Sequence, residues 1–148
     1  MSIKEELIRV LYQQVDIIQQ LVEVMYEKQR AVVNMQYDML RSHLTMEEEL
    51  AVKLRRLEER RLHLLMDLTG KSAKEVQEYS ISDLISDASQ QEVGTLKSIQ
   101  RQYKSLLKKL KSVTETNQVL IDHSRRFVEK LIKIMTANNE RPLVDHRA

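Results

Sequence analysis

The sequence predicts an all-α fold: an elongated antiparallel helical hairpin or three-helix bundle, with long coiled-coil-like helices and a short connecting helix. Glycine occurs twice and proline once in 148 residues, whereas a sheet protein of this length needs many more turn residues. Apolar residues also recur at alternating steps of three and four along most of the chain, which is the spacing of one helix face.

The first predicted helix runs from about Ser2 to about Asn34. Its seam steps by four and three residues through Leu7, Leu11, Gln14, Ile18, Leu21, Met25, Lys28 and Val32. Most of these positions are apolar, and further apolar residues flank them. The stripe is therefore wide enough to contact two other helices.

A second helix is predicted from about Gln36 to Thr69, with leucines mostly on one side and Gly70 as a left-handed C-cap. Met35, Met39 and Met46 lie near its start. Packing in the core is the default interpretation of each methionine. The alternative is an adaptable surface that accepts several partners.

A short helix is predicted from Ala73 to Tyr79, because Ser72 and Glu75 match a capping box. The serine-rich run 79–86 is predicted to be a weakly helical connector whose apolar side chains cover the end of the bundle. These side chains are Ile81, Leu84 and Ile85.

The last helix is predicted from about Gln90 to Ala137, opened by a second capping box of Ser89 and Glu92. Its seam comprises Leu96, Ile99, Tyr103, Leu106, Leu110, Val113, Asn117, Leu120, Ser124, Phe127, Leu131 and Ile134. At ~1.5 Å per residue this helix is about 70 Å long, more than either partner helix can cover. We predict one helical domain over residues 1–137 and a disordered C-terminal tail over 138–148, which contains the only proline.

Composition and charge exclude several classes of protein. The chain has no cysteine and no apolar run near the roughly 20 residues of a membrane span, so we expect a cytoplasmic protein that does not span the membrane. Residues 1–96 carry 12 Lys+Arg and 17 Asp+Glu, and residues 97–148 carry 12 and 5, so the two parts attract each other. No nucleic-acid partner is expected, because no aromatic side chains interleave with the basic ones between Lys104 and Arg126.

Catalysis, metal binding and cofactor binding are not predicted. The four histidines, at positions 43, 63, 123 and 146, form neither an HExxH nor a Glu-x-x-His motif. Two glycines cannot build a phosphate-binding loop. We therefore expect a protein that is not an enzyme and holds no cofactor or metal.

Four short motifs follow one another along the chain. They are Asp38-Met39-Leu40, then Leu-Glu-x-x-Arg-x-x-Leu-Leu at 57–65, then Ile81-Ser82-Asp83-Leu84-Ile85, then Asn117-Gln118-Val119-Leu120. In this order and spacing, the chain resembles the FlgN family over about residues 1–136. The last residues, 141–148, are not part of the resemblance.

The resemblance implies a substrate-specific chaperone of flagellar type III export. Such chaperones bind the C-terminal helical segment of hook-associated (hook-filament junction) proteins, prevent premature assembly and deliver these proteins to the cytoplasmic domain of an export-gate membrane protein. Their C-terminal helix carries substrate binding. The competing interpretation is a structural coiled-coil scaffold or adaptor that self-associates through the same seams, and a homodimer stays open.

We predict that the guest helix binds the last helix between Asn117 and Met135. The candidate contact residues are Asn117, Leu120, Ile121, Ser124, Phe127, Val128, Leu131, Ile132 and Met135. The pairs Leu120-Ile121 and Leu131-Ile132 widen the stripe beyond what one partner helix covers. Two alternatives stay open: these residues pack on the first helix, or Asn117 forms a hydrogen bond across the bundle.

Overall fold

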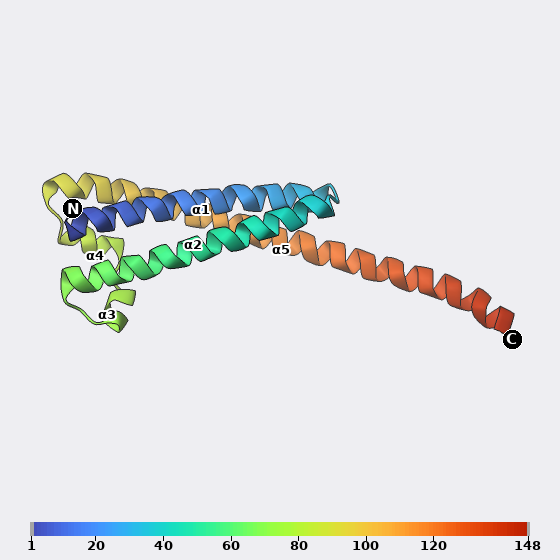
Figure 1. The fold of residues 1–148 in the computed structure, drawn as a ribbon. Helices are drawn as coiled ribbons and strands as arrows, with labels where there is room; N and C mark the ends of the chain where they lie inside the picture. Colours follow the sequence, from blue (N-terminus) through green and yellow to red (C-terminus); the bar gives the residue numbers. More distant parts are fainter. Residues whose placement is uncertain (1, 148) are drawn as a thin grey trace.

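Five helices make up the fold in the computed structural model (Figure 1). The structure describes residues 2–136 and, beyond them, only the bounds of the last helix. The helices are α1 (Ile3–Val33), α2 (Tyr37–Thr69), α3 (Ala73–Gln77), α4 (Ile81–Ser86) and α5 (Gln90–Arg147). The described residues form no strand, and the predicted all-α fold is confirmed. The last helix is longer than predicted, ending at Arg147 and not near Ala137, and the side chains of the predicted tail at 138–148 lie outside the described residues.

Helices α1 and α2 form an antiparallel hairpin, and α5 lies along α1 in the same direction as α1 (Figure 1). Three pairs of contacting residues fix the register of α1 and α5. Lys4 Nζ lies 3.9 Å from Glu92 Oε1, Tyr103 binds Gln14, and Asn117 binds Met25. The last two pairs are separated by 89 and 92 residues, so the register changes little along the bundle.

The core follows the seam predicted for the first helix, because all eight of its positions are buried. Gln14 and Lys28 belong to this seam although they are polar, and each has a partner on α2. Gln14 donates a hydrogen bond to Glu58, and Lys28 Nζ lies 3.2 Å from Glu47 Oε2. The wide apolar stripe of α1 thus contacts both neighbouring helices, as its width predicts.

The turn between α1 and α2 has a backbone conformation that disfavours most side chains. Met35 adopts a left-handed φ of 56°, at the position after the helix where glycine is usual. Its N–H binds the carbonyl of Val32, and the N–H of Gln36 binds the carbonyl of Ala31, which together make a Schellman motif. A non-glycine residue in this conformation costs on the order of 1 kcal/mol.

The other helix boundaries follow their capping residues. Gly70 ends α2 with a φ of 70°, and Ser72 with Glu75 forms the predicted capping box of α3. The prediction of a weakly helical connector over 79–86 was wrong in one respect. Ser80 and Asp83 form a further capping box, so residues 81–86 make a regular helix, α4.

The predicted role of the connector's apolar side chains is confirmed. Leu84 is buried in the core shared by the three long helices, and Ile81 and Ile85 pack against the same core. The connector therefore closes the end of the bundle that holds the N-terminus. The opposite end carries the α1–α2 turn, and α5 continues past it (Figure 1).

Candidate guest-binding surface

The first part of α5, residues 96–117, is covered by the rest of the bundle. Ile99 is completely buried, and Leu96, Val113 and Asn117 are each 2% exposed. We call residues 96–117 the covered half of α5. Its seam is the one that the sequence predicts.

Asn117 closes the covered half. Its Nδ2 donates a hydrogen bond of 2.8 Å to the backbone carbonyl of Met25. Of the two interpretations of Asn117, the structure therefore shows the hydrogen bond across the bundle. Because a buried amide needs a matching partner, this bond specifies which turn of α1 lies beside Asn117.

A polar cluster joins all three long helices near the middle of the bundle. Gln14 on α1 donates a hydrogen bond of 2.9 Å to Glu58 on α2 and accepts one from the Tyr103 hydroxyl on α5. Arg61 binds both carboxylate oxygens of Glu58, at 2.8 and 2.6 Å. Burial alone raises the pKa of Glu58, but hydrogen bonds from Arg61 and Gln14 and the charge of Arg61 lower this pKa below its ordinary value.

The described residues beyond Asn117 leave the bundle, and their burial falls along the helix. Leu120, Ile121 and Ser124 are half-buried beside the end of α1. The remaining predicted contact residues are exposed: Phe127, Val128, Leu131, Ile132 and Met135. Phe127, at 55% exposed, is the largest of them. We call residues 120–135 the free half of α5.

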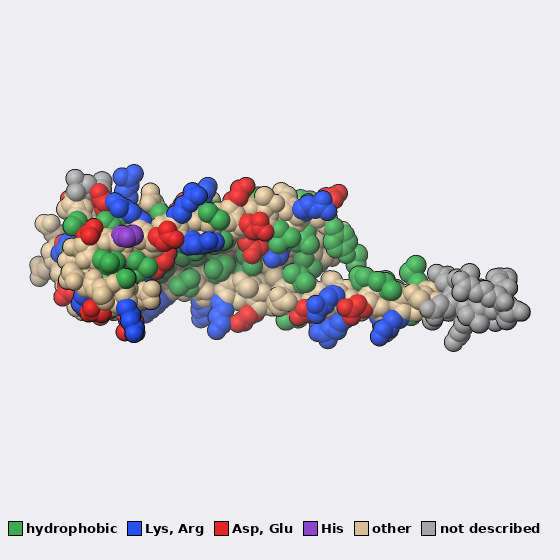
Figure 2. Space-filling model, turned by 60° about the horizontal axis from the view of Figure 1, so that its bottom comes forward, with side chains coloured by type: hydrophobic (Ala, Val, Ile, Leu, Met, Phe, Trp, Pro, Cys, Tyr) green, Lys and Arg blue, Asp and Glu red, His purple; other side chains and the backbone are tan. Residues whose placement is uncertain are grey.

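The exposed apolar side chains of the free half do not pack on α1. The α1–α5 register places Val33, where α1 ends, beside about residue 124 of α5. Beyond that level no described helix runs alongside α5 (Figures 1 and 2). Figure 2 shows apolar side chains along this projecting stretch and on the adjacent end of the bundle.

Basic side chains border the free half. Arg125 is already neutralised within the helix, by Asp122 at 3.6 Å and Glu129 at 4.0 Å. Arg126, Lys130 and Lys133 are exposed and form no ion pair with another described residue. The free half therefore combines an apolar stripe with an uncompensated positive charge.

A second exposed apolar surface surrounds the α1–α2 turn. Val33, Met35, Tyr37 and Met39 are 50–64% exposed, and we call these four residues the end surface. The default interpretation of Met35, Met39 and Met46 as core residues was wrong, because Met46 is exposed as well. Met35 and Met39 lie at the turn between α1 and α2, and Met46 lies further along α2.

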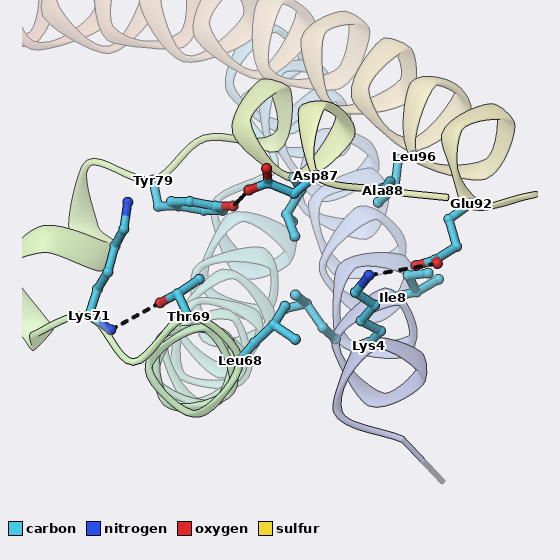
Figure 3. A pocket seen from close by; sticks show the side chains of 12 residues that line it. Lys4, Ile8, Leu68, Thr69, Lys71, Tyr79, Asp87, Ala88, Glu92 and Leu96 are labelled. Atoms are coloured by element: carbon cyan, nitrogen blue, oxygen red, sulfur yellow. Dashed lines mark hydrogen bonds and ion pairs between the residues drawn. The ribbon is translucent and has the colours of Figure 1, made fainter. Parts of the chain in front are cut away.

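The connector end of the bundle contains a cavity of about 300 Å³ (Figure 3). Its polar side chains pair with one another: the Tyr79 hydroxyl donates to Asp87 at 2.8 Å, and Lys4 faces Glu92. Burial, and next the hydrogen bond to Asp87, raise the pKa of Tyr79 to about 12. The first contact joins the two ends of the α4 segment and the second holds the start of α5 against α1, so both have a structural role.

Two further kinds of site are absent from the described part of the chain. No group of three or more His, Asp or Glu side chains there could hold a metal ion. No helix in that part is long and apolar enough to cross a membrane. What distinguishes the described surface is its exposed apolar side chains, at the end surface and on the free half of α5.

These observations define an all-α bundle from which one long amphipathic helix projects. Sequence comparison identifies the family. The chain belongs to the FlgN family, because the family model described as FlgN protein matches residues 1–144. The match extends past the 1–136 over which the motifs resemble the family. FlgN proteins are a family of flagellar export chaperones rather than enzymes. No curated protein and no solved structure matched the chain significantly.

Proposed function

We propose that this protein is a substrate-specific chaperone of flagellar type III export that binds the C-terminal helical segment of hook-associated proteins. The observation that carries the proposal is the row of apolar side chains on the free half of α5, which no described part of the chain covers. Contiguous exposed apolar surface on a protein of this size marks a site of interaction. An amphipathic guest helix fits it, with contacts spaced at three and four residues.

Binding by this surface requires no cofactor. The guest segment is disordered alone and becomes helical on the free half of α5, so part of the binding free energy is spent on ordering the guest. That cost limits the affinity and favours release when the guest is handed over. The chaperone acts as a one-to-one partner in the cytoplasm, shielding the guest until it reaches the cytoplasmic domain of the export-gate membrane protein.

Charge argues for a guest rather than a second copy of the chain. Self-pairing of two free halves would bring Arg126, Lys130 and Lys133 of each copy together, which is unfavourable. A guest that carries acidic side chains beside its apolar stripe meets these same residues favourably, which raises the association rate above all. The scaffold interpretation, which needs self-association through this surface, is accordingly the weaker one.

The test is the double variant Leu131→Ala/Ile132→Ala. Both side chains are exposed, so the melting temperature should stay near that of the wild type. Affinity for the C-terminal segment of a hook-associated protein of the same organism, measured by fluorescence anisotropy, should fall at least about tenfold, equivalent to ~1.4 kcal/mol. Leu107→Ala is the matched control, because Leu107 is 48% exposed on the covered half of the same helix.

Two results would refute the proposal. One is a stable double variant that binds the segment as tightly as the wild type. The other is a wild-type protein that shows no binding and instead forms defined oligomers by light scattering, which is the behaviour of a scaffold.

A further inference from the structure

Met35 occupies a position where its side chain is not required for folding. The backbone there is left-handed, with a φ of 56°, which glycine adopts freely and methionine does not. The Met35 side chain is 64% exposed, so packing in the core does not account for it. A large apolar side chain held in an unfavourable backbone conformation and exposed at the surface points to a binding role.

The end surface lies beside the guest-binding stretch of α5. The register places the end of α1 at about residue 124 of α5, so Phe127 and Val128 are the first exposed apolar residues past the turn. Figure 2 shows apolar side chains both on this end of the bundle and on the projecting stretch of α5 next to it. The two surfaces therefore meet at a corner.

We propose that the end surface is a second part of the guest site, so that a guest lying along the free half of α5 also contacts Met35 and Met39 with an apolar side chain. This inference rests on the proposed function. Methionine suits such a contact, because its flexible and polarisable side chain adapts to different guest side chains. One surface on α5 and another on the hairpin turn together fix how far along α5 the guest can lie.

The occupant is an acidic amphipathic segment of an exported protein. Arg126, Lys130 and Lys133 lie beside the corner without an ion-pair partner among the described residues, and they disfavour a second copy of this basic helix. A guest with carboxylates next to its apolar stripe neutralises them while its apolar end reaches the turn.

The decisive variant is Met35→Gly, because it separates binding from folding. Glycine relieves the left-handed backbone, and Met35 is 64% exposed, so the melting temperature should stay equal or rise. Affinity for the labelled C-terminal segment of a hook-associated protein should nevertheless fall about three- to tenfold, as expected for loss of one apolar contact. Met39→Ala should lower affinity in the same direction, while Tyr12→Ala, an equally exposed apolar change at a distance from the turn, should not.

The outcomes separate this inference from the proposed function. If Leu131→Ala/Ile132→Ala weakens binding while Met35→Gly and Met39→Ala bind like the wild type, the end surface is not part of the guest site. If none of these variants weakens binding, the proposed function itself fails. If Met35→Gly changes the mass measured by light scattering instead of the affinity, the end surface belongs to a second copy and the inference is overturned. Should Met35→Gly melt below the wild type, Met39→Ala decides alone.

Discussion

The covered and free halves of α5 have the same sequence pattern and different surroundings. The seam steps by three and four from Leu96 to Ile134 in both halves and is apolar except at Asn117 and Ser124. In the covered half the seam residues are buried or half-buried against the rest of the bundle, whereas from Phe127 onwards they are exposed. The cause of this difference lies in α1. This helix ends at Val33 and therefore covers only the first part of the apolar face of α5.

This comparison shows what a helical pattern specifies. The spacing determines which face of α5 is apolar, and burial of that face requires a partner of matching length. The covered half receives its partner from the same chain. The free half must receive one from another molecule or leave its apolar face in water, so the same helix carries a buried apolar face in one half and an exposed apolar face in the other.

The largest expected effect comes from truncating the same kind of side chain in each half. Ile99→Ala removes a completely buried side chain and should lower the free energy of unfolding by about 2–5 kcal/mol. Ile132→Ala, at 56% exposed, should change it by less than about 0.5 kcal/mol. Urea titration followed by circular dichroism measures both. Equal losses would mean that the two halves are covered alike in solution.

A substitution of Asn117 tests where the covered half of α5 ends. Asn117→Ala removes the hydrogen bond to the Met25 carbonyl and leaves a buried space, so the free energy of unfolding should fall by about 1–3 kcal/mol. Ser124→Ala, two seam positions further and only half-buried, is the matched control and should have little effect. An Asn117→Ala protein as stable as the Ser124→Ala protein would place the boundary before residue 117.

The smallest effect concerns the polar cluster that joins α5 to the hairpin. The pKa of Glu58 is lower in the folded protein, so its contribution to stability is present above the ordinary carboxyl pKa and is lost as the pH falls through the lowered value. Glu58→Gln should therefore destabilise the protein most near neutral pH, and the difference from wild type should shrink in acid. Because the Glu58 side chain is 45% exposed, the effect should be below about 1 kcal/mol.

Urea midpoints of the wild type and Glu58→Gln at neutral and acidic pH measure this difference. Glu115→Gln on the exposed side of the covered half makes the same change in charge and serves as the control. A difference in urea midpoint between wild type and Glu58→Gln that grows towards low pH would contradict the lowered pKa of Glu58.

Much of the fold could be predicted from sequence because its signals are local. The seam of α1 indicates its buried face, and Gly70 and the Ser72–Glu75 capping box mark helix ends by their own backbone chemistry. Helix α4 was underestimated because its capping box uses Asp83 in place of the more usual glutamate. The six residues of α4 are also too few to show the helical spacing of apolar positions.

The register between helices could not be predicted, and the candidate site depends on it. A seam with steps of three and four can pair with α1 at several offsets, and the contacts of Glu92, Tyr103 and Asn117 with α1 select one. Without that offset, the level at which α5 leaves the bundle is unknown. The sequence therefore predicted an uncovered apolar stripe between Asn117 and Met135, but neither the level at which the exposure begins nor the closeness of the stripe to Met35.

The parallel arrangement of α1 and α5 also bears on synthesis. Within the hairpin, the contact between Lys28 and Glu47 joins residues 19 positions apart, whereas the bonds between α1 and α5 join residues 89 and 92 positions apart. Each doubling of loop length adds about 0.6 kcal/mol of closure cost, so the hairpin closes at lower cost than the α1–α5 contact. At about 5–20 residues per second, the ribosome needs a few seconds to extend the chain from the end of α2 to Asn117. During that interval the face of α1 that later receives α5 is open to any other apolar helix emerging nearby.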